Sequence, residues 1–432
     1  MRSTPGVVIA VIVVAASGVA RAETLEDAWQ LALQHDQALA AKASEVAAAR
    51  EGERAASAAR WPTVQAIGGY SRFATAPAFD LSGPSLSFRS APIFDQDDYV
   101  AGRVHLSLPL YTGGQISAGV DAARQAVVGA EEDERGTRSA LRLDVARAYV
   151  DVLRARRMLH AAESSVTSLT AHVGDVQQLV DRELVPTSDL LAARVALANA
   201  EQGRVRAANS VQIAHASYNR RIGEPLDRAP DLDERLPVDP SLAATVPVEV
   251  LIERALGSRS ELNGLAARAE ALDLRSRAEL ASLRPQLALT GEYSHLENEF
   301  LDREDFSMVG VGVQWSLFDG GQARHRAAAL RNASRAARHR LGDLRSLIEL
   351  EVREAWLDVQ AARARLSASR EAVTQAEENL RMTRELYGAD LGTNTQVLEA
   401  VALRVTATNN HDDAVLDEAL TLLQLAHAAG AL

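Results

Sequence analysis

The chain is an internal duplication, and this feature constrains its fold more than any other. Residues 110–115, of sequence LYTGGQ, recur 207 positions later as residues 317–322, of sequence LFDGGQ. Upstream the offset is 223, because Tyr70 matches Tyr293, so the first copy holds a longer loop before residue 110. Repeats of one supersecondary unit pack against each other. The fold must therefore contain the same order of elements twice.

Each copy is predicted to contain a short helix, a second helix, a strand, a loop, a strand, a very long helix, a turn and a final helix. The longer loop of the first copy contains Pro77, Pro84 and Pro92. Residues 224–247 hold five prolines among acidic residues and predict a linker or a small irregular collar. The predicted organisation is a signal peptide at 1–22, a first repeat at 23–223, the linker at 224–247 and a second repeat at 248–432.

The first residues predict export. Arg2 supplies a positive charge, residues 7–16 form a short apolar run, and residues 20–22 give an A-x-A pattern. This pattern predicts cleavage before Glu23, and the alternative is an uncleaved anchor. No later run approaches the ~20 apolar residues that a transmembrane helix needs. If such a chain enters a membrane, it must do so as a barrel.

Two very long helices are predicted, one in each copy. Residues 115–182 and 322–386 contain no proline, and at 1.5 Å per residue each stretch reaches roughly 100 Å as a helix. Apolar residues recur there in alternating steps of four and three, which is the pattern of a coiled-coil seam. The seam positions are Leu141, Val145, Ala148, Val152, Ala155 and Leu159 in the first copy and Ile348, Val352, Ala355, Val359, Ala362 and Leu366 in the second.

Four strands are predicted, two in each copy. They cover about residues 63–73, 99–110, 286–295 and 306–318. Apolar and polar residues alternate along them, for example Val309, Val311 and Val313 against Gly310, Gly312 and Gln314. One apolar face over ~10 residues is typical of a transmembrane barrel strand. The alternative is a sheet that is half-buried on a soluble core.

The number of strands separates these two alternatives. Small barrels need ~8 strands or more, so four strands cannot close one. An open sheet edge is not tolerated in lipid. The flanking helices are also far too long for a compact domain. The sequence therefore favours an α+β membrane protein in which several chains share one barrel.

Composition and motifs exclude several function classes. The formal net charge is −12, whereas nucleic-acid binding needs a basic surface. The sequence has no cysteine, which excludes disulfides, thiolate catalysis, cysteine-based metal sites and a lipid anchor on an N-terminal cysteine. It also has no H-E-x-x-H pair, no P-loop and no G-x-S-x-G elbow. No catalytic, cofactor or metal site is predicted.

The duplicated strand–strand–helix–helix unit resembles the TolC family of outer-membrane efflux proteins over essentially the whole mature length. The strand ends at residues 109–114 and 317–321 are of the P-L-F-x-G-G type. Residues 387–398 are similar to a Y-x-x-G-x-x-x-x-x-V-L turn, with the tyrosine at its start and the Val-Leu pair at its end but Asp390 at the fourth position. The resemblance implies a homotrimer with one twelve-stranded barrel in the outer membrane, continuous with a periplasmic α-helical coiled-coil barrel. It also implies a periplasmic adaptor (a membrane fusion protein) and an inner-membrane transporter as partners, in an efflux or type I secretion system that conducts solutes passively.

The resemblance further implies that the periplasmic entrance lies at the two helix–helix turns. Candidate turn residues at the adaptor contact are Leu184, Pro186, Thr187, Gly388, Gly392 and Thr393. Candidates for a pore constriction are Asp189, Gln396 and Glu399, since a threefold ring of carboxylates would concentrate negative potential and bind cations. The alternative is that Asp189 caps a helix together with Thr187 and Ser188, and that Glu399 faces solvent.

Glycines are expected to shape the chain at two kinds of place. Gly388 and Gly392 are expected to supply turn conformations that are closed to other residues. Glycines are also expected where each strand turns into the long helix that follows it. These junction residues are Gly113, Gly114, Gly320 and Gly321.

Two other function classes stay open on the sequence. A periplasmic coiled-coil scaffold or adaptor would explain the helices but leaves the alternating strands without a purpose. An exported enzyme is disfavoured, because the catalytic motifs are missing. Retention of the chain in the outer-membrane fraction would separate the channel from both alternatives.

Overall fold

The structure of the chain is a computed structural model that describes residues 22–75, 78–79, 91–92, 98–237, 246–297 and 303–432. The predicted signal peptide lies outside these residues except for Ala22. Pro77 and Pro84 of the longer loop, and residues 238–245 of the predicted linker, lie outside them as well.

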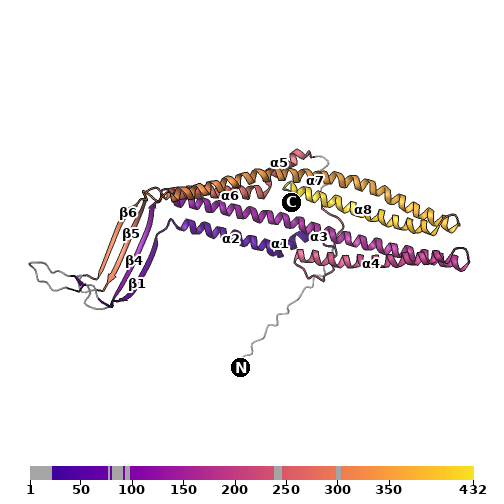
Figure 1. Ribbon diagram of the computed structural model, residues 1–432, viewed down its shortest axis with the longest axis horizontal. Coiled ribbons are helices and arrows are strands. Elements are labelled where there is room, and N and C mark those ends of the chain that lie inside the picture. The colour runs from indigo at the N-terminus through magenta and orange to yellow at the C-terminus, as the bar shows by residue number, and fades with distance from the viewer. Residues whose placement is uncertain (1–21, 76–77, 80–90, 93–97, 238–245, 298–302) are drawn as a thin grey trace, which may run out of the picture. The chain divides into compact units, whose positions relative to one another are not determined.

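The two copies contain matching elements in the predicted order, except that the longer loop of the first copy also holds two short strands that were not predicted (Figure 1). The first copy comprises α1 (Leu25–His35), α2 (Gln37–Ala58), β1 (Thr63–Arg72), β2 (Ala78–Phe79), β3 (Ala91–Pro92), β4 (Asp98–Tyr111), α3 (Gln115–Asp181) and α4 (Thr187–Ile222). The second comprises α5 (Val248–Ser258), α6 (Ser260–Ala281), β5 (Gln286–Leu296), β6 (Asp305–Gln314), α7 (Gln322–Gly388) and α8 (Asn394–Ala428). α1 and α5 have 11 residues each, α2 and α6 have 22, and α3 and α7 have 67. The predicted duplication is confirmed.

Contacts divide the chain into two compact units. One comprises Gln37–Arg138 and Ile252–Glu351; it holds the strands and is named the sheet unit here. The other comprises Met1–Asp36, Ser139–Leu251 and Val352–Leu432. It holds the α3–α4 and α7–α8 turns and is named the hairpin unit. The long helices α3 and α7 contribute residues to both units.

In the sheet unit, β1, β4, β5 and β6 form one antiparallel sheet in that order, so that β1 and β6 are its edges (Figure 1). The strands lie where the sequence predicts them, except that the last one ends at Gln314 and not near residue 318. The reason is that β5 begins at Gln286, which is the partner of Gln314. Beyond this pair β6 has no strand to bond within the described sheet.

The register places the alternating residues of the four strands on common faces, because directly opposed residues of antiparallel strands point to the same side. Leu106 opposes Val64 on one side and Gly291 on the other, and Leu289 opposes Val311. The apolar face of the sheet carries Val64, Tyr70, Val100, Val104, Leu106, Leu108, Leu287, Leu289, Tyr293, Val309, Val311 and Val313. The polar face carries Gln65, Arg103, His105, Thr290, Glu292 and Gln314.

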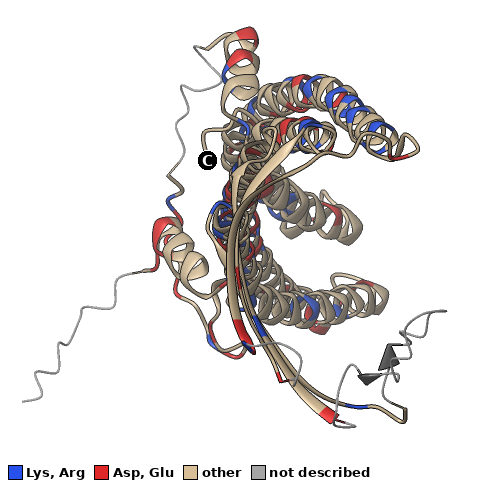
Figure 2. Ribbon diagram, turned by 90° about the vertical axis from the view of Figure 1, so that its left-hand side faces the viewer, with Lys and Arg blue, Asp and Glu red and all other residues tan. Residues whose placement is uncertain are grey.

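Charged residues are distributed unevenly between helices and strands (Figure 2). They occur all along the helices, whereas the strands of the sheet carry Arg72, Asp98, Arg103, Glu292 and Asp305. Each of these five lies in the half of its strand that is farther from the adjoining helix. The rows of the sheet next to the helices are therefore uncharged.

The predicted seams of the two long helices are buried. Of the twelve predicted positions, all except Leu159 and Leu366 are less than a tenth exposed. Small residues let neighbouring helices approach closely in the sheet unit, where Ser276 of α6 donates to the Ala327 carbonyl of α7 (2.8 Å). Among the described residues, no helix is both long and apolar enough to cross a membrane.

Candidate functional site

The two helix–helix turns of the hairpin unit have the same backbone structure. Leu184 N donates to Leu179 O (2.9 Å), and Leu391 N donates to Leu386 O (2.8 Å). Bonds that reach back five residues close a Schellman-type helix end, in which one residue has a left-handed backbone. The left-handed residues of the two turns are Glu183 and Asp390, and both have a φ of 61°. Since they are 207 positions apart, the turn itself is duplicated.

The expectation for the glycines of the second turn is wrong. Neither Gly388 nor Gly392 has a positive φ, and Gly388 is the last residue of α7. Asp390 takes the left-handed conformation instead, because a short polar side chain tolerates it. Gly392 lies in a tight place, since a Cβ there would be 3.2 Å from the backbone nitrogen of Tyr387 and 3.3 Å from the Leu386 Cβ.

The helices that follow the two turns begin differently. α8 begins with a capping box, in which Thr393 Oγ1 accepts from Gln396 N (3.3 Å) and Gln396 Oε1 accepts from Thr393 N (2.8 Å). At α4 the N-cap is Pro186, and no side-chain capping bond is present there among the described residues. Asp189 therefore does not cap α4 with its two preceding neighbours, and Gln396 is engaged in capping α8.

The two hairpins pack together next to the turns through an apolar core that consists of two clusters of buried residues. One cluster comprises Val176, Leu190, Ala193, Tyr387 and Val397. The other comprises Leu169, Leu380, Ala400 and Val401. Leu190 and Val397 are 207 positions apart and lie in the same cluster, so equivalent residues of the two copies meet there.

A buried polar link crosses the same core. Asn394, the first residue of α8, donates from Nδ2 to the backbone oxygen of Asp189 in α4 (3.0 Å). Its Oδ1 lies 2.7 Å from Nε2 of His172 in α3, so it is the acceptor of that bond. The His172 and Asn394 side chains are almost fully buried. Burial lowers the pKa of His172 below its usual value of 6.5, and the neutral ring donates through Nε2.

The carboxylate of Asp189 lies at the rim of the core. Its Oδ2 is 3.4 Å from the hydroxyl of Tyr387 in α7. Burial, together with the negative charge of Asp189, raises the pKa of Tyr387 to about 12. The phenol is therefore a hydrogen-bond donor at neutral pH, and it orients the carboxylate.

Glu399 is exposed on α8, in a groove of about 510 Å³ that Met382 and Leu403 also line. Its equivalent in the first copy is the uncharged Ala192, and the equivalent of Asp189 in the second copy is the uncharged Gln396. The two turns therefore share a backbone but carry their carboxylates at different positions.

Sequence analysis missed His172 and Asn394, which are 222 positions apart. A weak signal was present for the histidine, because it follows Leu169 by three residues and precedes Val176 by four. This spacing places a polar ring on the apolar side of a helix.

The strand-to-helix junctions of the sheet unit use the four predicted glycines. Their φ angles are 63° at Gly113, 91° at Gly114, 68° at Gly320 and 85° at Gly321. At Gly113 a Cβ would also lie 2.7 Å from the Arg284 Cβ, and Arg284 Nη1 donates to Gly113 O (2.7 Å). In the second junction Asp319 accepts from the amides of Gly321 and Ala323 (both 2.8 Å). These bonds, chiefly that from Ala323, lower the pKa of the Asp319 carboxyl.

These features together define a class of protein. An antiparallel sheet with one apolar face and open edges continues through left-handed glycine junctions into paired long helices, whose turns are held by a buried polar link. Among the described residues no group of three or more His, Asp or Glu side chains could hold a metal ion.

Comparison with known proteins agrees with this class. The family described as "Outer membrane efflux protein" matches residues 28–224 and 251–431. Outer membrane protein TolC of Vibrio cholerae serotype O1 is 24% identical over 371 residues, which cover 84% of each chain. Alkaline protease secretion protein AprF of Pseudomonas aeruginosa is 25% identical over 352 residues, which cover 78% of this chain and 71% of AprF. The crystal structure of the outer membrane protein VceC from Vibrio cholerae superposes with a TM-score of 0.78 at 19% identity, and covers 94% of this chain and 96% of that chain.

The chain belongs to the outer membrane efflux protein family. The predicted family, fold class and location are confirmed: it is an outer-membrane channel of the efflux and secretion type that extends into the periplasm. The interpretation as a periplasmic scaffold or adaptor is set aside by the family match.

Proposed function

We propose that three copies of this chain close one twelve-stranded barrel, continuous with a helical tube, and that the assembly conducts solutes passively without catalysing a reaction. One observation carries the proposal: the sheet has an apolar and a polar face but two open edges, β1 and β6. Unpaired backbone groups of an edge find no partner in lipid. Joining three sheets edge to edge satisfies both edges of every copy and gives twelve strands.

In this proposal the two faces of the sheet lie in different environments. The apolar face meets the outer-membrane lipid, and the uncharged rows next to the helices form the band at membrane depth. The polar face lines the lumen. Arg103 and His105 lie on this face beside Glu292. Arg103 Nε is 3.5 Å from Glu292 Oε1, and His105 Nδ1 is 3.6 Å from Glu292 Oε2. A water-filled lumen keeps such charged groups hydrated, which lipid would not.

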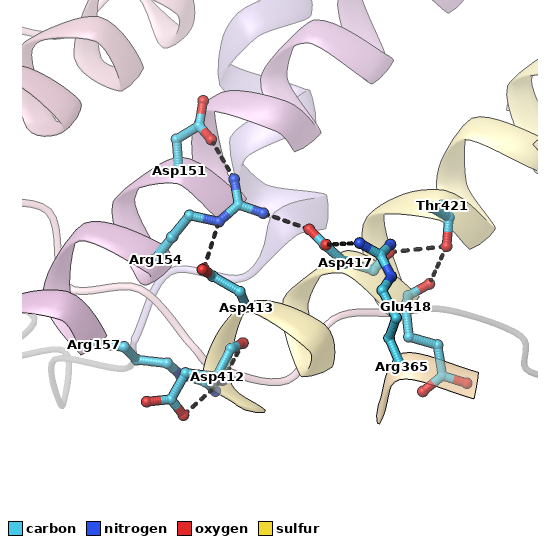
Figure 3. A network of polar contacts seen from close by, with 9 residues as sticks. All are labelled: Asp151, Arg154, Arg157, Arg365, Asp412, Asp413, Asp417, Glu418 and Thr421. Carbon is cyan, nitrogen blue, oxygen red and sulfur yellow. Dashed lines mark hydrogen bonds and ion pairs between the residues drawn. The ribbon is translucent and has the colours of Figure 1, made fainter. Parts of the chain in front are cut away.

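A seam inside the hairpin unit supports a specific way for neighbouring copies to join. α3 packs on α8 through ion pairs, with Arg154 Nε 3.0 Å from Asp413 and Arg154 Nη2 2.7 Å from Asp417 (Figure 3). Arg365 of α7 reaches the other oxygen of Asp417 at 3.4 Å (Figure 3). By duplication, the equivalent seam would join α7 to α4. In the three-copy assembly, α7 of one copy therefore meets α4 of the next.

The surfaces of α7 and α4 fit this arrangement. Both helices carry exposed apolar residues at heptad-like spacing, which a lone chain in water would leave uncovered. On α7 these are Leu357, Ala361, Ala364 and Ala368, and on α4 they are Leu191, Val195, Ala198, Val205 and Ile213. Leu357 is 57% exposed and Val205 is 61% exposed in the single chain. A second copy would remove this area from water.

The entrance lies at the helix–helix turns. Three copies would bring together three Asp189 and three Glu399 carboxylates near the tube end, where they form a cation-sensitive constriction with Gln396 between them. A periplasmic adaptor contacts the turns at Leu184, Pro186, Thr187, Gly388, Gly392 and Thr393. Exposed Leu184 and Leu391 support this contact, since they are 61% and 76% exposed at the tips. An inner-membrane transporter completes the path.

The same proposal divides the chain into a signal peptide at 1–22, repeats at 23–223 and 248–432, and a linker at 224–247. The element boundaries support it: α4 ends at Ile222 with the left-handed Gly223 as its C-cap, and α5 begins at Val248.

The number of chains in the detergent-extracted particle tests the proposal. Light scattering corrected for bound detergent is expected to give three chains, and the particle is expected to conduct ions across a planar bilayer. A monomer that stays soluble without detergent would leave the sheet edges open and would contradict the channel.

A further inference from the structure

Glu23, which follows the predicted cleavage pattern, is held by its backbone on both sides. Its nitrogen donates to the Asp231 carbonyl oxygen (2.7 Å), and its carbonyl oxygen accepts from Asp233 N (3.0 Å). These bonds form a parallel β-bridge between Glu23 and Leu232. Glu23, which precedes the N-cap Thr24 of α1, is thus fixed to the segment that follows α4.

The Glu23 carboxylate is held as well, with its side chain only 10% exposed. Arg228 Nη2 lies 2.6 Å from Oε2, and the Tyr218 hydroxyl donates to Oε1. The Tyr149 hydroxyl lies 2.8 Å from Glu23 O and 2.6 Å from Asp233 O. Both tyrosines are fully buried, with rings edge to face at 5.9 Å. Burial raises the pKa of both phenols, so they stay protonated and can donate.

The duplication provides an internal comparison for this cluster. The positions equivalent to Glu23, Tyr149 and Tyr218 in the second copy are Val246, Trp356 and Leu425. Both offsets are supported by the structure: Gly223 and Gly430 are 207 positions apart and both left-handed, at φ 79° and 70°, and α1 and α5 begin 223 positions apart, at Leu25 and Val248. Glu23, the Tyr218 phenol that bonds its carboxylate and the Tyr149 phenol that bonds its backbone oxygen are therefore present in the copy that begins at the predicted cleavage point, and Val, Leu and Trp replace them in the other.

We propose that Glu23 is the first residue of the mature chain and that Tyr218, Arg228 and the Asp231 carbonyl form a docking site for this new N-terminus. A leader peptidase and one water molecule break the Ala22–Glu23 peptide bond. The water oxygen bonds to the Ala22 carbonyl carbon, and both water protons end on the Glu23 nitrogen. This leaves a carboxylate on Ala22 and an ammonium group on Glu23. The proposal rests on the export that the proposed function requires.

An ammonium group suits the site better than the amide it replaces. The Glu23 nitrogen already donates to Asp231 O, and a positive charge on the donor strengthens such a bond. The acidic groups around the bridge are Glu23, Asp231, Asp233 and Glu234, and the basic groups that bond there are Arg156, Arg157 and Arg228. Arg235 follows Glu234, so acids and bases are equal in number, and the favourable contribution is the charged hydrogen bond to the Asp231 carbonyl. Docking then ties α1, α3, α4 and the segment after α4 together once the leader is gone.

The sequence allows a direct test, because Lys42 is its only lysine. The mature chain then has two amines, and the Lys42 amine, with its side chain 34% exposed, serves as the reference. The full chain, purified from membranes in detergent, is treated briefly at pH 8 with the N-hydroxysuccinimide ester of acetic acid, and its peptides are measured by mass spectrometry. A free α-amine, of pKa ~7.7–8.0, reacts faster than a lysine of pKa ~10.4. We expect a terminal peptide that begins at Glu23 and an α-amine that reacts more slowly than Lys42.

Tyr218→Phe and Glu23→Ala should each speed acetylation of the α-amine about tenfold relative to Lys42, because each removes a hydrogen bond to a charged group at the docking site. Glu26→Ala, at an exposed position in the first turn of α1, should leave the rate unchanged. A mature terminus at another residue would overturn the proposal. So would an α-amine that reacts as fast in the natural chain as in both variants. Neither result would touch the three-copy channel, which chain number and conductance test separately.

Discussion

α3 and α7 have the same length and bury equivalent seam positions, but their outer surfaces differ. Arg154 of α3 pairs with two aspartates of α8, whereas its equivalent on α7 is the exposed Ala361. Val150 of α3 is fully buried, whereas its equivalent, Leu357, is 57% exposed. The ion pairs explain this difference, because α8 of the same chain lies against this side of α3, whereas the proposed partner of α7 is α4 of a second copy. A duplicated helix keeps its core pattern, and its outer surface is adapted to whichever chain covers it.

The largest effect on assembly is expected where α7 meets the next copy. Leu357→Arg should abolish the three-chain particle, because an unpaired charge buried at each interface costs roughly 3–5 kcal/mol. Chain number by light scattering measures this. Ser367→Arg, at an exposed position away from the apolar stripe, is the control and should assemble normally. Normal assembly of Leu357→Arg would place the interface elsewhere.

A smaller loss of assembled particles is expected from a substitution on the lipid side of the edge strand β6. Val311→Arg should hinder assembly, since a charge facing lipid at mid-membrane costs ~2–4 kcal/mol. Met308→Arg lies on the polar face of the same strand, opposite Glu292, and should be tolerated. The yield of heat-resistant particles from outer membranes compares the two. Equal yields would refute the assignment of the faces.

A charge exchange can rebuild the α3–α8 ion pair between copies. Ala361→Arg introduces the equivalent of Arg154 but places it near Arg206, the equivalent of Asp413, and should weaken assembly by about 1 kcal/mol. Adding Arg206→Asp should restore assembly. Dissociation temperatures of the single and double variants test the rescue. A double variant no more stable than Ala361→Arg would contradict the proposed pairing of α7 with α4.

The buried link between the hairpins should make stability depend on pH. Burial lowers the pKa of His172 in the folded chain, although its bond to Asn394 and the nearby Asp175 and Asp189 oppose the shift and Arg384 supports it. The folded state therefore disfavours protonation. This contribution is fully present above pH 6.5 and is lost as the pH falls towards the lower folded value. Unfolding temperatures at pH 7.5 and 5.5 should differ less in His172→Gln than in the natural chain.

His215, whose pKa is also lowered by burial, supplies a background slope that both proteins share. An unchanged difference between the two pH values in His172→Gln would show that His172 does not contribute.

The smallest effect on stability is expected at the entrance, where the two copies present different charges. Glu399→Ala should leave the unfolding temperature unchanged, because Glu399 is exposed, and should weaken the block of single-channel current by divalent cations. Gln396→Ala, which removes one side of the capping box, should instead lower stability by ~1 kcal/mol. Unchanged block in Glu399→Ala would remove this residue from the constriction.

The sequence by itself determined the architecture. The absence of proline from residues 115–182 and the four–three spacing of seam residues such as Val145 and Val152 predicted the long helices. Alternation along residues 306–318 predicted a strand with one apolar face, although the strand ends at Gln314. These signals are local and periodic, so they survive without knowledge of the partner elements. The repeat then supplied the order, because each element was seen twice.

Only the tertiary structure decided which residue performs each role at the turns. Asp390 and not Gly392 takes the left-handed backbone, and Gln396, a candidate for the pore, caps α8. His172 reaches Asn394 across 222 positions of sequence. Such contacts depend on distances between helices that follow different parts of the chain, and no spacing within one helix encodes them. The same holds for β6, which ends where β5 begins and not where its own alternation stops.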